Sequence, residues 1–338
     1  MKARLLSRRT LLQHSVALCC AGAFARQAFA DSDSAVAAGS AAPAQPDAQA
    51  AGAASAAAAG TLLIGGDMSV VRLGLGAMRI TGDGIWGEPS DVGAAHALLR
   101  RALALGVNFL DTADAYGPAV SERLIAEALY PYPRDLVIAT KGGLVRPSRS
   151  EWRPDGRPQH LREACEASLK RLRLERIDLY QLHRPDPDVP LADSLGALKD
   201  LQQAGKIRHI GLSNVDVGQL RQAQGIVKVV SVQNRYNVAD RASEDVLAIC
   251  EREQIAFLPW GPLARRPQDA ASPVAALVAL NEIAAERHLP LPTVALAWLL
   301  AKSPVMLPIP GTARIDHLEQ DLGAAQLRLS AAEMQRIA

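Results

Sequence analysis

Residues 92–117 read VGAAHALLRRALALGVNFLDTADAYG and contain the repeating unit that decides the fold. Between Val92 and Leu105, apolar residues recur every three or four positions, which is the spacing of an amphipathic helix, and Gly106 is a typical helix end. The apolar run 107–110 has the length of a buried strand, and Asp111 opens a polar loop. The stretch predicts a helix, a turn, a strand and a loop in that order.

The same alternation continues along the rest of the chain, after a hairpin-like start at 62–71. Short apolar runs lie at 72–76, 107–110, 136–139, 177–182, 207–211, 229–232, 255–258 and 305–309. Helix-length amphipathic segments such as 191–204 and 244–253 separate them, as expected when crossover helices connect parallel strands. Because eight such units in about 250 residues are typical of a (β/α)8 TIM barrel, we predict this α/β fold for residues 61–338.

A doubly wound parallel sheet is the main alternative fold. Such a sheet normally has a G-x-G-x-x-G phosphate-binding turn after its first strand. The corresponding stretch 74–79, GLGAMR, lacks the third glycine, and the sequence contains no P-loop motif. The pattern therefore favours the barrel.

Residues 1–30 have the parts of an export signal: a basic start, an apolar stretch from about 14 to 24, and the cleavage pattern AFA at 28–30. The segment SRRTLLQ at 7–13 resembles a twin-arginine signal, and an ordinary secretory signal with paired arginines is the alternative. The apolar stretch is shorter than the roughly 20 residues of a membrane span. Lipid attachment at Cys19 or Cys20 is less favoured, because bulky Leu18 precedes the pair. We predict a cleaved signal peptide, an export machinery as partner, a periplasmic location and no stable membrane insertion of the mature chain.

Residues 31–60 are rich in alanine, with Pro43 and Pro46 and almost no large apolar side chains. Such a segment buries too little surface to offset the entropy of ordering, so we predict a disordered linker. The remaining residues 61–338 contain equal numbers of basic and acidic side chains. This balance argues against a nucleic-acid partner, whose phosphates require a basic face.

Polar side chains follow most of the predicted strands. Because the carboxyl ends of all strands of a β/α barrel meet at one rim, these residues converge on one mouth. Singly, each has an ordinary structural explanation, such as a helix cap or a buried core histidine, but their joint order along the chain favours a site. They are Asp111, Lys141, His183, Ser213, Asn214, Gln233, Asn234 and Trp260.

The chemistry of these residues is suited to carbonyl reduction. Tyr116 lies in the loop after Asp111, and a phenol with a pKa near 10 exchanges its proton poorly at neutral pH. A buried Lys141 ammonium is expected to lower that pKa, with Asp111 compensating its charge. His183 can then donate a hydrogen bond to a carbonyl oxygen. No side chain supplies a hydride, so a redox cofactor is required.

The chain resembles the aldo-keto reductase superfamily. The resemblance covers nearly all of residues 62–338 and rests on motifs in family order: NFLDTADAYG at 108–117, IATKGG at 138–143, DLYQLH at 178–183, GLSN at 211–214, VQNRYN at 232–237 and PIPGT at 308–312. The resemblance implies a catalytic tetrad of Asp111, Tyr116, Lys141 and His183, with Tyr116 as general acid. It implies no metal.

The resemblance also implies a nicotinamide cofactor. Ser213, Asn214 and Gln233 match the positions that hold its carboxamide, and Trp260, followed by Gly261, Pro262 and Leu263, stands where the family usually stacks a Tyr on the nicotinamide ring. The segment 311–321 matches the loop and helix around the adenosine 2′-phosphate, which implies cofactor contacts from Gly311, Thr312, Arg314, Gln320 and Asp321. Thr312 and Arg314 favour NADP(H) over NAD(H), whereas His317 and the Gln320-Asp321 pair depart from the common family pattern.

The expected substrate is a small carbonyl compound in an open pocket, lined by Trp86, Tyr116 and His183. The arginines of the loop after Lys141, including Arg146, either favour an anionic substrate or are simply solvated. Two alternatives to a reductase are a nucleotide-binding regulatory or sensor subunit with little turnover, and an alcohol dehydrogenase working in the oxidative direction.

Overall fold

The computed structural model describes residues 55–263 and 274–338. The predicted signal peptide and residues 31–54 of the predicted linker lie outside these residues. The elements, in chain order, are η1(Ala56–Ala59), β1(Thr61–Ile64), β2(Met68–Val71), β3(Leu75–Gly76), η2(Ala77–Ile80), α1(Val92–Ala104), β4(Phe109–Asp111), α2(Val120–Leu129), β5(Val137–Gly142), β6(Leu144–Val145), β7(Arg153–Pro154), α3(Pro158–Leu172), β8(Ile177–Leu182), α4(Leu191–Gln203), β9(Ile207–Ser213), α5(Val217–Gln224), β10(Val229–Gln233), α6(Glu244–Glu253), β11(Ala256–Phe257), α7(Val274–Glu286), α8(Leu291–Lys302), α9(Ile315–Gly323) and α10(Ala331–Ile337).

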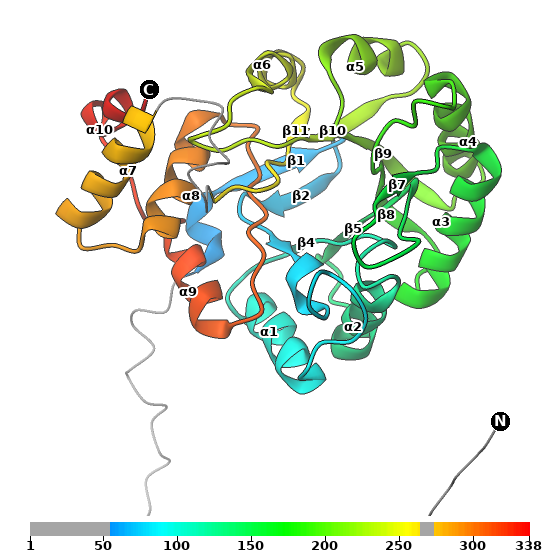
Figure 1. Cartoon of the computed structure of the whole chain (residues 1–338), viewed down its shortest axis with the longest axis horizontal. Helices are drawn as coiled ribbons and strands as arrows, with labels where there is room; N and C mark the ends of the chain where they lie inside the picture. The colour runs from blue at the N-terminus through cyan, green and yellow to red at the C-terminus, as the bar shows by residue number, and fades with distance from the viewer. Residues whose placement is uncertain (1–54, 264–273) are drawn as a thin grey trace, which may run out of the picture. The chain divides into compact units, whose positions relative to one another are not determined.

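Seven parallel strands form one curled sheet in the order β11-β10-β9-β8-β5-β4-β3, and helices surround it (Figure 1). Residues 305–310 close the sheet into a barrel. On one side, Leu307 N–H donates to Phe257 O over 2.8 Å, and on the other, Gly74 N–H donates to Pro308 O over 3.0 Å. Pro308 and Pro310 lack an N–H group, so this segment cannot form a regular ladder on both sides. The predicted (β/α)8 barrel is confirmed.

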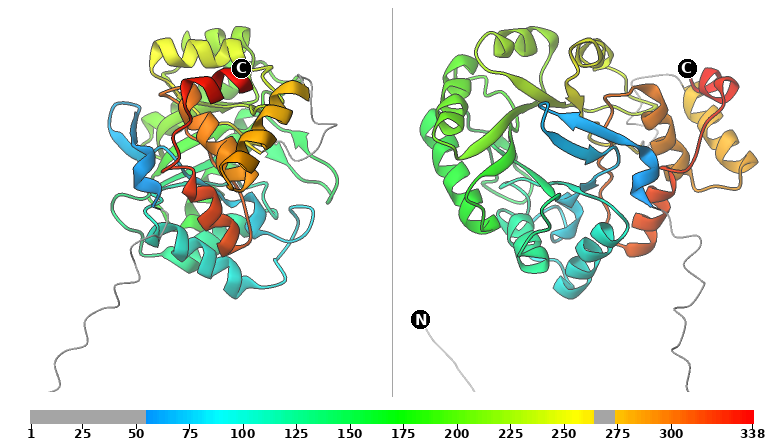
Figure 2. Two further views of the ribbon diagram at one scale, coloured as in Figure 1. Left: turned by 90° about the vertical axis from the view of Figure 1, so that its left-hand side faces the viewer. Right: turned by 180° about the vertical axis from the view of Figure 1, so that it is seen from behind.

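The antiparallel hairpin of β1 and β2 covers the end of the barrel opposite the carboxyl ends of its strands and is seen from that side in the right panel of Figure 2. Its inward side chains Ile64, Met68 and Val70 pack on the apolar side chains that fill the barrel. Polar side chains on the rim hold the hairpin in place: Asp67 contacts His209 at 2.6 Å and Arg208 at 2.8 Å. The hairpin therefore closes the floor of the barrel.

The structured part of the chain includes residues that the sequence assigned to the linker. Ala56 is fully buried, and its N–H donates to Leu105 O over 2.9 Å. Arg328 donates to Ala58 O over 2.9 Å. The predicted boundary at residue 60 is thus too late for this stretch, because a small alanine helix can bury its methyl groups against the barrel without needing large side chains.

The α-helices carry the sequence signals that begin and end helices. Asp91 caps α1 by accepting from Ala94 N–H over 2.8 Å, and Asp216 and Ser330 form capping boxes at α5 and α10. Within the described residues, no helix is both long and apolar enough to cross a membrane.

Candidate active site

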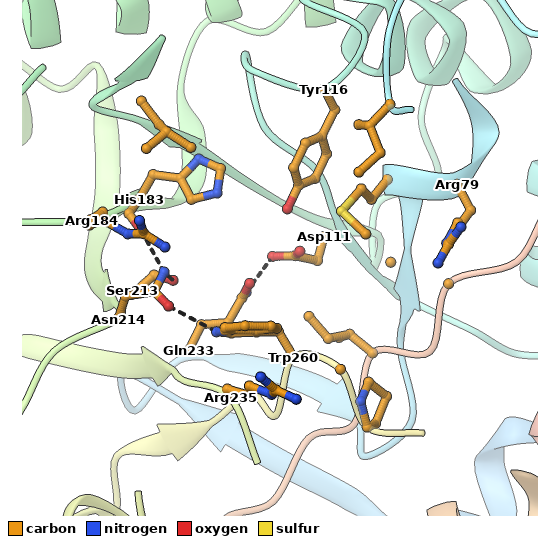
Figure 3. Close-up of a pocket in the computed structure, with 18 of the residues that line it drawn as sticks. Arg79, Asp111, Tyr116, His183, Arg184, Ser213, Asn214, Gln233, Arg235 and Trp260 are labelled. Carbon is orange, nitrogen blue, oxygen red and sulfur yellow. Dashed lines mark hydrogen bonds between the residues drawn. The ribbon is translucent and has the colours of Figure 1, made fainter. Parts of the chain in front are cut away.

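A cavity of about 840 Å³ opens at the carboxyl ends of the barrel strands. Most of the residues that the sequence placed at strand ends line it, and Figure 3 shows Asp111, Tyr116 and His183 around a common space with Trp260. The lining residues are Gly76, Met78, Arg79, Ile85, Asp111, Tyr116, Leu144, Trp152, His183, Arg184, Ser213, Asn214, Gln233, Arg235, Asn237, Trp260, Gly261, Pro262, Leu263, Ile309 and Gly311.

Asp111, which lines this cavity, forms a buried ion pair with Lys141. The Lys141 ammonium is 2.7 Å from Asp111 Oδ2 and also donates to Thr112 O over 2.8 Å. The other carboxylate oxygen, Asp111 Oδ1, accepts from Gln181 over 3.1 Å and from Gln233 over 2.8 Å. The charge of a buried carboxylate is tolerated only when such partners replace water. Lys141 and Asp111 lie at the ends of the neighbouring strands β5 and β4, which brings them together.

Tyr116 lies above this pair. The Lys141 ammonium is 3.4 Å from the Tyr116 hydroxyl oxygen, at the long end of hydrogen-bond distance. The phenol ring meets the rings of His183 and Trp152 edge to face, with centroids 5.8 and 6.4 Å away. The loop that carries Tyr116 is fixed by its backbone, since Asp114 N–H donates to Lys141 O and Ser121 N–H donates to Tyr116 O. The Tyr116 hydroxyl is therefore held so that it faces the cavity near Asp111 (Figure 3).

The protonation of Tyr116 differs from the sequence-based expectation. Burial raises the pKa of Tyr116 above its ordinary value, and the Lys141 ammonium lowers that pKa only in part. Burial also acts to lower the pKa of Lys141, but attraction to Asp111 raises it overall, so Lys141 stays charged. The predicted net lowering of the Tyr116 pKa was wrong. Loss of water around the phenolate raises this pKa by more than one ammonium at 3.4 Å lowers it.

His183 is a neutral imidazole on the cavity wall. Its backbone N–H donates to Gly142 O over 2.9 Å, and its Nδ1 atom has no hydrogen-bond partner among the described residues. Burial, together with the positive charges of Lys141 and Arg184, holds the pKa of His183 well below its ordinary value. A neutral imidazole has one N–H donor, so the ring can hydrogen-bond a substrate oxygen without adding a charge.

Ser213, Asn214 and Trp260 form a connected polar group next to His183 (Figure 3). Asn214 has a left-handed backbone with φ of 59°, which Asn tolerates better than most residues. Its side-chain amide donates to Ser213 Oγ and to His183 O, both over 3.0 Å, and accepts from Trp260 Nε1 over 3.0 Å. This network fixes the Trp260 indole in orientation beside the cavity. Asn234, by contrast, donates to and accepts from the backbone of Val215 and has a structural role.

The distal part of the expected cofactor site lies around the start of α9. Gly311 lines the cavity, and an added Cβ there would meet Gly76 O at 2.9 Å, so the backbone leaves a cradle that only glycine keeps open. The Thr312 hydroxyl accepts from Arg314 N–H over 3.1 Å, and the exposed Arg314 guanidinium pairs with Asp316. Gln320 and Asp321 do not line the cavity; Gln320 O accepts from Thr293, and Asp321 is buried.

The substrate side of the cavity differs from the expected arrangement. The structure places Tyr116 and His183 there as predicted, but Ile85, Leu144 and Trp152 form the wall instead of Trp86. Trp86 is next in sequence to Ile85, and its backbone pairs with Gly117. The backbone turns at Ile85, which has a left-handed φ of 58°, so these two neighbouring side chains do not face the same way.

Sequence reasoning missed three arginines of the cavity lining. Arg79 and Arg184 lie on opposite sides of the view in Figure 3, and Arg235 lies beside Trp260. Arg79 is close to Gly311, whose added Cβ would lie 3.4 Å from Arg79 Cγ. Each follows a strand end by only a few residues, and that position was the signal that could have identified them. Asp111 is neutralised by Lys141, and Arg235 is paired with Asp240 at 3.1 Å, so Arg79 and Arg184 make the mouth suited to an anionic dinucleotide.

The sequence model of the aldo/keto reductase family matches residues 72–338. The chain belongs to this family. An uncharacterized oxidoreductase of Schizosaccharomyces pombe is 49% identical over 272 residues, covering 80% of this chain and 87% of that protein. The pyridoxine 4-dehydrogenase of Escherichia coli is 41% identical over 273 residues, which cover 78% of this chain and 93% of that protein. An aldo-keto reductase of Klebsiella pneumoniae, solved in complex with NADPH, has a TM-score of 0.67 at 26% identity. The match covers 82% of this chain and 93% of that one.

Membership of the aldo/keto reductase family makes the chain an oxidoreductase, and its structural neighbour from Klebsiella pneumoniae holds NADPH. The cavity fits that cofactor: it has the flat Trp260 indole, the Gly311 cradle and cationic side chains along its length. The residue set that the sequence selected for the catalytic centre, Asp111, Tyr116, Lys141 and His183, is brought together in one place.

Proposed function

We propose that the protein reduces an aldehyde or ketone to an alcohol with NADPH, and that Tyr116 is the general acid. The observation that carries the proposal is the position of the Tyr116 hydroxyl, which is 3.4 Å from the Lys141 ammonium and in a cavity shared with neutral His183. Bound NADPH supplies the hydride that the carbonyl carbon accepts.

The side chains have distinct roles in this reaction. The His183 ring orients the carbonyl oxygen by a hydrogen bond, and the Tyr116 hydroxyl gives its proton to that oxygen as it gains negative charge. The phenolate that remains is stabilised by the Lys141 ammonium, whose charge is balanced by Asp111. Because an alkoxide is a stronger base than a phenolate, the raised pKa of Tyr116 still allows the transfer and keeps the proton in place beforehand.

For the cofactor, we propose that Trp260 stacks on the nicotinamide ring, with Ser213, Asn214 and Gln233 near its carboxamide. Gly261, Pro262 and Leu263 then lie along the pyrophosphate, together with Arg79. Thr312 and Arg314 are proposed to hold the 2′-phosphate. Arg314 directly precedes α9 and its side chain makes no capping hydrogen bond there, so a phosphate at Arg314 would also lie at the positive end of that helix. NADPH is thereby preferred over NADH.

Turnover of NADPH by purified residues 31–338 tests the function, with a panel of aldehydes that includes pyridoxal and aromatic aldehydes. The change Tyr116→Phe removes one oxygen and should lower kcat by about 10²–10⁴-fold, with NADPH affinity, measured by fluorescence, within about twofold. NADPH binding without turnover of any panel member would favour a cofactor sensor. Equal rates in wild type and Tyr116→Phe would contradict the role of Tyr116.

We also propose export by the twin-arginine route, supported by Arg8 and Arg9 in the leader together with a cofactor-dependent fold. That route carries folded proteins, so the cofactor can travel already bound. Replacing both arginines with lysine should leave the protein in the cytoplasmic fraction of the expressing bacterium. Full export of this variant would contradict the proposed route.

A further inference from the structure

Arg146, in the loop between β6 and β7, is almost fully buried although it lies at the mouth of the barrel, with 8% of its surface exposed. Its guanidinium donates to four backbone carbonyls. Two belong to the loop that follows η2: Ile85 O at 2.9 Å and Gly84 O at 3.3 Å. Two belong to its own loop: Arg149 O at 2.6 Å and Glu151 O at 3.2 Å. Arg146 therefore joins two loops that are far apart in the sequence, at a place where the Arg149 side chain also lies against Gly84.

The same guanidinium supports an aromatic wall of the cavity. The Arg146 Cζ atom lies 3.7 Å from the centroid of the Trp152 ring and 5.4 Å from that of Trp86. Contact at this distance places the planar cation against the indole face. Trp152 lines the cavity and meets Tyr116 edge to face. The position of Arg146 thus determines where the indole stands relative to the proposed acid.

The carbonyl group of Ile85 connects the Arg146 side chain to the loop that carries Tyr116. Ile85 O accepts from Arg146 and also from Gly117 N–H, the residue after Tyr116. Ile85 has a φ of 58°, a left-handed conformation that is unfavourable for a β-branched residue. Such a conformation persists only when surrounding contacts impose it. Arg146 provides two of those contacts, one to Ile85 and one to Gly84.

We propose that Arg146 is a positioning residue that fixes Ile85 and Trp152 as the substrate wall and so selects carbonyl compounds with a flat apolar group, aromatic aldehydes above all. The proposal rests on the proposed carbonyl reductase function. The wall that Arg146 supports is apolar, being made of Ile85, Leu144 and Trp152. The Arg146 charge is directed into backbone carbonyls and an indole face, so it does not serve as the anion-binding group that the sequence left open.

The test compares benzaldehyde with propanal, which is too small to reach both sides of the wall. In Arg146→Met, which keeps an unbranched apolar stem about as far as the Arg Nε position but removes the guanidinium and its donors, kcat/KM for benzaldehyde should fall about tenfold or more through a rise in KM. The value for propanal should change less than about threefold, and NADPH affinity should stay the same. Arg146→Lys should resemble Arg146→Met, because one ammonium cannot serve four carbonyls on two loops. Arg153→Met, at an exposed arginine of β7 directly after this loop, is the matched control.

A second readout is independent of turnover. Hydrogen exchange of residues 82–87 in the NADPH-bound protein should accelerate in Arg146→Met and stay unchanged in Ile85→Gly, because glycine adopts a positive φ without strain. Ile85→Gly should still weaken benzaldehyde binding through loss of the side chain. Equal losses for both aldehydes in Arg146→Met, or no loss for either, would overturn the proposal. If wild type reduces no carbonyl compound, the proposed function fails, and unchanged exchange in Arg146→Met would then separately overturn the positioning role.

Discussion

The Lys141 ammonium and the Asp111 carboxylate meet at 2.7 Å inside the barrel, where their side chains are 0% and 3% exposed. Removing one partner leaves the other charge buried and uncompensated, so Lys141→Met should lower the free energy of unfolding by about 3–5 kcal/mol. The double variant Lys141→Met, Asp111→Asn removes both charges and should recover part of this loss, while turnover stays absent. Urea unfolding of the three proteins measures the effect; a single variant as stable as wild type would contradict it.

The pH dependence of the rate should reflect the shifted groups. The pKa of His183 is held well below 6.5, so His183 stays neutral above that pH, and the pKa of Tyr116 is raised above 10.0, so its proton is retained. We expect kcat/KM for reduction to be constant between about pH 6.5 and 9. In the oxidative direction Tyr116 must lose its proton, so that rate should rise steadily with pH. If kcat/KM for reduction decreases as the pH is lowered below 7, His183 titrates near its ordinary pKa.

Asp114 is expected to limit stability at alkaline pH. Burial, with repulsion from Glu122, raises the pKa of Asp114 to about 8, and its Oδ1 atom has no hydrogen-bond partner among the described residues. A carboxyl with a raised folded-state pKa binds its proton more tightly in the folded protein, so its contribution to stability is lost as the pH rises from about 4 towards 8. Asp114→Asn should therefore stabilise the protein at pH 9 by roughly 4 kcal/mol more than at pH 5. Urea unfolding at both pH values tests this, and a difference of the opposite sign would contradict it.

Asp316 is expected to weaken the binding of the cofactor's 2′-phosphate. Its carboxylate pairs with the exposed Arg314 guanidinium, including an Nε to Oδ1 contact of 2.9 Å. A phosphate must displace this partner before it gains the full charge of Arg314. Asp316→Asn should therefore lower the Kd for NADPH by about two- to fivefold. Fluorescence titration should show no change for NADH, which lacks the phosphate, and an equal gain for both cofactors would place the effect elsewhere.

The hairpin at the floor of the barrel is expected to contribute to stability and not to chemistry. Met68 is buried at 2% exposure against the barrel interior, whereas Leu63 on the same hairpin is 55% exposed. Met68→Ala leaves a cavity and should cost about 2–5 kcal/mol, with kcat unchanged below the melting temperature. Leu63→Ala is the control and should cost less than about 0.5 kcal/mol. Similar losses in the two variants would mean that the hairpin does not pack as described.

Much of the fold and of the catalytic set follows from local sequence. Helix and strand periods alternate around stretches such as 92–117, and a barrel built from them places every strand end on the same rim. Asp111, Lys141 and His183 could therefore be assigned to one site before any distance was known. The rule that connects them is geometric and does not depend on the identity of the neighbouring side chains.

Other features depend on contacts between residues far apart in the chain, and only the tertiary structure decided them. Gln181 was not singled out as a partner of Asp111, because a glutamine within a strand has no distinguishing local pattern. The net direction of the Tyr116 pKa required the balance between burial and the Lys141 ammonium. Burial is a sum over the whole fold, so short-range patterns do not determine it.

The loops at the mouth of the barrel also combine features that the sequence predicts with features that only the tertiary structure decides. The sequence placed Trp86 and Arg146 near the site, but it could not tell which side chain faces the cavity, because loops lack the regular period of helices and strands. The structure turns Ile85 and Trp152 inward and directs Arg146 into the backbone of two loops. The sequence by itself determined the barrel, the rim and the reactive groups on it. Long-range packing and hydrogen bonding decided how those groups are protonated and which walls enclose them.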